Sequence, residues 1–160
     1  MEAQTACCLI VALSNIKVPF QVLLSISSLI HHNRNNIVRM AFKEGCSHLL
    51  FVDSDMVFDH DAIQRLLDRD LDIVAGRYNK KVAPIVSTVP DIWGLSSVPF
   101  VPAGFLLIDM EVFKKIGEPY FSFEGAESED AYFCQKVIKN GYEVWCDPTI
   151  QIGHLGSSVF

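Results

Sequence analysis

The chain has 160 residues, 50% of them hydrophobic and 20% charged, which is the composition of a folded protein and excludes a disordered one. Its formal net charge of -6, with no run of lysine or arginine to offset it, argues against binding of nucleic acid. The length suits one domain, so we expect a single domain over residues 1–160.

The apolar stretches, the opening residues and the cysteines together predict a cytoplasmic protein. No apolar stretch approaches the ~20 residues needed to cross a bilayer, so we expect no transmembrane segment. The opening Met-Glu-Ala-Gln has no basic residue before the apolar run, unlike a secretory signal. The five cysteines are odd in number and form no C-x-x-C pair, which favours reduced thiols.

The first elements along the chain are apolar runs. Residues 7–13 form a continuous apolar run, typical of a strand buried on both faces. Residues 21–30 are apolar and fit either a strand or a helix. Residues 35–44 have apolar side chains at helical spacing, and Gly45 stands where a C-terminal cap belongs.

Strand and helix patterns alternate along the rest of the chain. We expect strands at 48–53, 73–75, 105–108 and 143–146, and helices at 62–69, 111–116 and 129–140, with a proline-containing connection at 84–102. This alternation predicts an α/β fold with a mostly parallel central sheet and helices on both faces. Ligands of such sheets bind beyond the carboxyl ends of the strands.

Asp53-Ser54-Asp55 places two carboxylates directly after the strand expected at 48–53. In extended backbone, side chains at i and i+2 project to the same side, so both could face one point. Two converging oxygens suit a hard divalent cation, which can bridge to phosphate oxygens and stabilise a diphosphate leaving group. Alternatively, one aspartate caps the next turn and the other is solvated, since Asp-x-Asp is frequent by chance.

Glu129 and Asp130 open the helix expected at 129–140, directly after Ser128. A structural role is one interpretation, because acidic residues in the first turn favour the helix dipole and serine is a good cap. Asp130, however, shares a helix face with the apolar residues four, seven and eight positions later, so it should point inward. Beside a cleft, it could act as general base on an acceptor hydroxyl.

His154 and Arg34 are further candidates. His154 lies between Gly153 and Leu155-Gly156, after the last strand-like run, and a neutral imidazole could complete a metal site begun by Asp55. A surface histidine in a tail is the alternative. Arg34, at a helix start, could contact a phosphate or a base, or it could be solvated.

Taken in order, these motifs resemble the GT-A glycosyltransferases, specifically small bacterial and phage-type members related to the large inverting glycosyltransferase family 2. The matching stretches are NRNNIVRMAFKEGCSHLLFVDSDMVF, DIVAGRYNKK, AGFLLIDMEVFKKIG, SEDAYFCQKVIKNGYEVWCDP and IGHLG. They cover most of the chain from residue 33 onward. The resemblance implies a GT-A-like, Rossmann-like fold and an enzyme that uses a nucleoside-diphosphate sugar.

The resemblance also implies roles for individual residues. Asp55 and His154 would bind Mn2+ or Mg2+, and Asp53 would contact the metal or the donor ribose. The turn at Gly104 would lie along the donor sugar. Asp130 would be the catalytic base, with Glu129 as its neighbour, and the sugar would be inverted on transfer to a glycan, lipid or protein acceptor.

Two rival functions follow from the same residues. A haloacid-dehalogenase-like phosphatase would use Asp53 as nucleophile and Asp55 as general acid, and would need a later lysine, for which Lys114 and Lys115 are poor candidates. A non-catalytic domain that binds nucleotide sugar is the other rival, since only about thirty residues precede the first matching stretch. Apolar residues 98–101 could also form an interface between copies.

Overall fold

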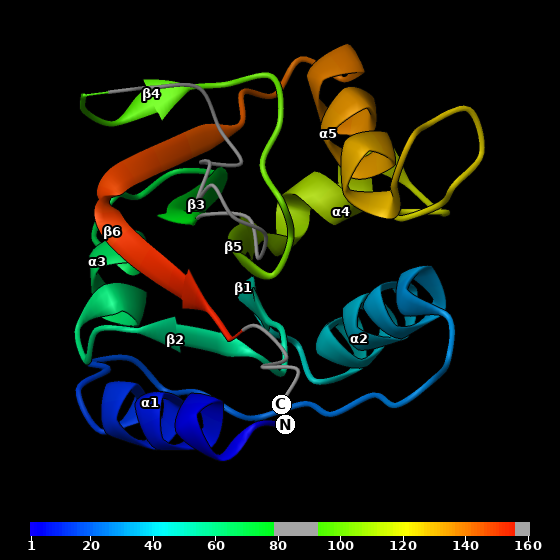
Figure 1. Ribbon diagram of the computed structural model, residues 1–160. Helices are drawn as coiled ribbons and strands as arrows, with labels where there is room; N and C mark the ends of the chain where they lie inside the picture. The colour runs from blue at the N-terminus through cyan, green and yellow to red at the C-terminus, as the bar shows by residue number, and fades with distance from the viewer. Residues whose placement is uncertain (79–92, 156–160) are drawn as a thin grey trace, which may run out of the picture.

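A mixed sheet forms the centre of the computed structural model, which describes residues 1–78 and 93–155 (Figure 1). The strands are β1 (His48–Val52), β2 (Met56–Phe58), β3 (Ile73–Tyr78), β4 (Ser96–Ser97), β5 (Phe105–Asp109) and β6 (Trp145–His154). The helices are α1 (Ala3–Leu13), α2 (Ile30–Lys43), α3 (Ala62–Leu67), α4 (Met110–Ile116) and α5 (Glu129–Lys139). The strand order is β1-β5-β3-β6-β2, and β4 pairs with β6.

The expectation of a mostly parallel sheet is wrong for the described part of the chain. There, β3 and β6 run parallel, whereas β1 with β5, β3 with β5, β2 with β6 and β4 with β6 run antiparallel. The apolar runs reflect burial of a strand on both faces, and such burial says nothing of strand direction. β5 is buried over its first four residues and is nonetheless antiparallel to both neighbours.

Helices cover both faces of this sheet, as the alternation predicts. Leu106 and Ile108 of β5 belong to a core cluster that includes residues of α2, α4 and α5. Phe105 and Leu107 point to the opposite face, where their cluster includes residues of α1 and α3. The α/β class and its two helical layers are thus confirmed, and each layer packs on alternate residues of the same strands.

The run at 7–13 is part of helix α1 and not a buried strand, which corrects the expectation. Thr5 and Ala12 are buried, and Cys8, Leu9 and Leu13 are partly buried against the core. These positions have the i, i+3, i+4, i+7, i+8 spacing of one helix face. A short apolar run does not by itself distinguish a strand from a helix with one buried side.

Other boundaries also differ from expectation. α2 begins at Ile30, five residues earlier than expected, and β6 continues to His154, well beyond residue 146. β2 and β4 were not expected, and residues 84–92 of the proline-containing stretch lie outside the described residues. Val98 and Val101 are buried in the core, so they form no exposed interface. No helix within 1–78 or 93–155 has the length and apolarity for a membrane crossing.

β3 and β6 approach each other closely at Gly76. A Cβ atom there would lie 2.8 Å from Ile152 Cγ1 and 2.9 Å from the Ile150 carbonyl oxygen, which is closer than packed atoms allow. We expect Gly76→Ala to lower the free energy of unfolding by about 1–3 kcal/mol, since overpacking forces the strands apart. Urea unfolding followed by circular dichroism measures this change.

Gly94→Ala is the matched control, because a Cβ at Gly94 meets nothing within 4 Å. If Gly76→Ala proves as stable as Gly94→Ala, the close approach of β3 to β6 is not present in the protein.

Candidate active site

Arg34 of α2 brings three of the sequence-predicted carboxylates together. Its Nη1 and Nη2 each lie 3.4 Å from an oxygen of Asp53, and Nη1 also donates a 3.1 Å hydrogen bond to the Ala103 carbonyl. Its Nε lies 3.6 Å from Glu129 and 3.5 Å from Asp130. Only 4% of the side chain is exposed, so this cluster is a buried ion network that joins α2 to the end of β1 and the start of α5.

Two aromatic rings enclose the guanidinium. Its Cζ lies 5.4 Å from the ring centre of Phe51 and 5.8 Å from that of Phe121, within cation–π range. Asn35 holds Phe121 in place, because its side chain accepts hydrogen bonds from the backbone N–H groups of Tyr120 and Phe121 and donates one to the Phe121 carbonyl. These supporting residues were not predicted, as nothing in the spacing links residue 35 to residue 121.

Asp130 points inward, as its helix position predicts, and its side chain is 15% exposed. Burial raises its pKa from 3.8 to about 6, against the lowering effect of Arg34, and the negative charge of Glu129 adds to the rise. Ser128 accepts a 3.1 Å hydrogen bond from the Ala131 N–H and so begins α5 as an N-cap. The cap fixes the two acidic residues in the first turn, facing Arg34.

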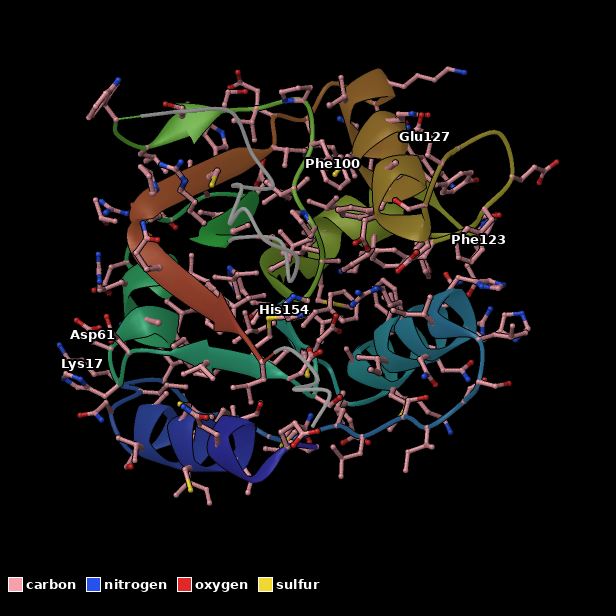
Figure 2. The ribbon with its side chains drawn as sticks, viewed as in Figure 1. Lys17, Asp61, Phe100, Phe123, Glu127 and His154 are labelled. Carbon is pink, nitrogen blue, oxygen red and sulfur yellow. The ribbon has the colours of Figure 1, made fainter. Side chains whose placement is uncertain are left out.

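Asp55 and His154 form a second, more exposed pair. His154 Nε2 lies 3.3 Å from Asp55 Oδ2, with side-chain exposures of 20% and 23%. The antiparallel pairing of β2 with β6 creates this contact, because it sets Met56, the residue after Asp55, opposite His154. Figure 2 labels His154 at the end of β6. The Leu155 N–H donates a 2.8 Å hydrogen bond to the Asp55 carbonyl and extends the pairing. Gly156, the last residue of the Gly153–Gly156 stretch that contains His154, lies outside the described residues.

The pair has the separation that two neighbouring ligands of one cation would have, roughly 3 Å for metal–ligand bonds of about 2.1 Å. Among residues 1–78 and 93–155, no three His, Cys, Asp or Glu side chains are grouped to hold a metal. Asp55 and His154 are thus two candidate ligands, and their role in binding a metal stays a prediction. Both oxygens of Asp53 face Arg34 instead.

Gly104 lies at the same end of the sheet. Val52 pairs with Phe105, and the Asp53 N–H donates a 2.9 Å hydrogen bond to the Gly104 carbonyl. The turn before β5 is thereby fixed beside the end of β1. The sequence-predicted site residues thus fall into two groups: Arg34, Asp53, Gly104, Glu129 and Asp130 are joined by one set of contacts, and Asp55 contacts His154 in another. Their roles toward a ligand stay predictions.

No protein-family model matches the chain, and no curated protein matches it. Among the solved structures that resemble it are the following two. The protein A197 from STIV is 23% identical with a TM-score of 0.69, over 92% of this chain and 78% of that one. The structure of GalNAc-T7 with UDP, GalNAc and Mn2+ is 13% identical with a TM-score of 0.56, over 78% of this chain but 30% of that one. At these identities the likeness shows the fold alone, a fold that this glycosyltransferase shares.

The raised pKa of Asp130 predicts a pH-dependent stability. The folded state keeps this proton up to about pH 6 and the unfolded state only to about pH 4, so raising the pH from 4 to 6 removes stability. We expect Asp130→Asn to be more stable than the wild type at pH 8, by up to about 2–3 kcal/mol, and the difference to vanish near pH 4. Urea unfolding at several pH values measures it.

The exposed Asp59 supplies the control, since Asp59→Asn should change stability little at either pH. A destabilised Asp130→Asn at pH 8, or a difference independent of pH, would mean that Asp130 ionises without penalty in the folded protein.

Proposed function

We propose that this protein is a metal-dependent glycosyltransferase that moves a sugar from a nucleoside-diphosphate donor to an acceptor hydroxyl. The observation that carries the proposal is the buried Asp130, with a pKa of about 6, held by the same arginine that holds Asp53. A basic carboxylate and an Asp-x-Asp turn are the two parts such an enzyme needs at one site. The fold shared with GalNAc-T7 supports the same class.

Asp130 is suited to the role of general base. A carboxylate with a pKa of about 6 is ionised at neutral pH and is a stronger base than an ordinary aspartate. In the proposed reaction it takes the proton of the acceptor hydroxyl while that oxygen bonds to the anomeric carbon. The bond from this carbon to the diphosphate breaks in the same displacement, so the configuration inverts. Glu129, 3.6 Å from Arg34 Nε, helps to hold the network in place.

Asp55 and His154 would hold Mn2+ or Mg2+. When bound, the ion would supply to the departing diphosphate a positive charge that offsets the net negative charge of the protein. The Mn2+ and UDP in the GalNAc-T7 structure support this assignment. Asp53, which is 36% exposed, would contact the donor ribose, and Gly104 would let the donor sugar lie close to the backbone.

The contacts around Asp53 disfavour the phosphatase. Such an enzyme requires a lysine beside its nucleophilic aspartate, whereas within residues 1–78 and 93–155 the cation that contacts Asp53 is Arg34. The two lysines considered for that role have their contacts elsewhere. Lys114 forms an ion pair with Glu111, and Lys115 Nζ lies 4.5 Å from the ring centre of Tyr142.

Nucleotide binding tests the proposed metal pair. We expect one nucleoside diphosphate to raise the unfolding temperature in the presence of Mn2+, and the effect to disappear in Asp55→Ala. At a hundredfold excess over Kd the gain is about 2.7 kcal/mol. Asp59→Ala, a nearby exposed aspartate, should behave as the wild type. Equal stabilisation with and without Mn2+ would contradict a role for the pair in metal binding.

Transfer or donor hydrolysis tests the base. We expect Asp130→Asn to lower kcat by about 10²–10⁴ while nucleotide binding persists. In the wild type, kcat/KM should rise with pH and level off above about pH 6, because only the ionised carboxylate accepts a proton. An active Asp130→Asn would refute the assignment. Binding without any turnover in the wild type would favour the non-catalytic domain.

A further inference from the structure

Residues 18–30, hereafter the apolar segment, expose alternate apolar side chains. The segment links α1 to α2 and runs along the outside of the molecule (Figure 1). Val18, Phe20, Val22, Leu24 and Ile26 all expose their side chains, and Leu24 and Ile26 are 69% and 97% exposed. Leu23 and Ser25, which lie between the last three, are half-buried, so Val22, Leu24 and Ile26 lie on the outer side.

The inner side of the apolar segment is attached to the protein. Gln21 Nε2 donates a 3.3 Å hydrogen bond to Cys46 Sγ, and Leu23 packs against the core. Ser25 Oγ donates a 3.0 Å hydrogen bond to Asn33 Oδ1. These contacts fix which side faces the core, so the segment cannot turn its apolar side inward without breaking them. The apolar side chains on the outer side of the segment therefore face solvent and not the core.

The exposed area is large for a monomer. The segment's seven exposed apolar side chains are Val18, Phe20, Val22, Leu24, Ile26, Leu29 and Ile30. From their exposed fractions they present together on the order of 700 Å², close to the ~800 Å² per partner of a standard interface. Such an area marks an interaction surface.

We propose that the apolar segment is the interface of a symmetric dimer, in which the same segment of a second copy covers it. The segment contains no charged residue, although the whole chain carries a net charge of -6. Two copies therefore repel each other least where their apolar segments meet, and a self-complementary apolar patch needs no charge pairing. A membrane surface fits less well, because apolar faces that bind anionic lipid are flanked by several lysines or arginines.

Light scattering during gel filtration tests this proposal, from about 1 µM to about 100 µM. We expect the wild type to reach twice its 17.9 kDa mass, and Ile26→Glu to raise the dimer Kd at least about tenfold. Trp93→Glu is the matched control, since Trp93 is 99% exposed and Ile26 is 97% exposed. Leu24→Glu is a second variant on the same side, and far-ultraviolet circular dichroism reports whether each variant is folded.

The dimer is refuted if the wild type stays monomeric at the highest concentration. It is also refuted if Trp93→Glu dissociates the dimer as strongly as Ile26→Glu, or if neither of the two segment variants weakens it. A monomer that floats with phosphatidylcholine vesicles, and loses this property in Ile26→Glu, would assign the segment to a membrane instead.

Discussion

The buried guanidinium of Arg34 is the interaction on which the candidate active site depends. A charge that is 4% exposed is costly unless counter-charges surround it, and Asp53, Glu129 and Asp130 provide them. The three segments that meet there are separated by up to 96 positions in the chain. Their convergence is therefore a property of the folded state, and removing the arginine would leave buried carboxylates without a counter-charge.

The charges of the same cluster do not balance, and this imbalance bears on the chemistry proposed for it. Three carboxylates surround one guanidinium, and burial, together with the negative charge of Glu129, raises the pKa of Asp130 in spite of Arg34. A stabilising network would match its charges more closely. Excess negative charge in a partly desolvated site attracts a proton or a cation, and both are required in the proposed transfer. These electrostatics are those that the proposed function requires.

The sequence predicts individual site residues better than it predicts their neighbours. Asp53, Asp130 and His154 stand out because strand ends and helix starts can be read from local patterns. Asn35 and Phe121 cannot be found this way, since their contact joins residues 86 positions apart. The prediction of strand direction fails for a related reason. β5 has the continuous apolar run of a buried strand, but its antiparallel pairing depends on the path of the chain between strands, which the run does not encode.

His154 reaches Asp55 only because β6 continues past an irregularity. The predicted strand stops at residue 146, before Pro148, a residue that ordinarily ends a central strand. In the structure, Gly76 pairs with Asp147 and Arg77 with Gln151, so residues 148–150 are inserted relative to β3. Asp147 fixes this insertion, because its buried carboxylate accepts hydrogen bonds from Thr149 and from Arg69. The proposed metal pair therefore depends on a second buried carboxylate–arginine contact, at a distance from the pair itself.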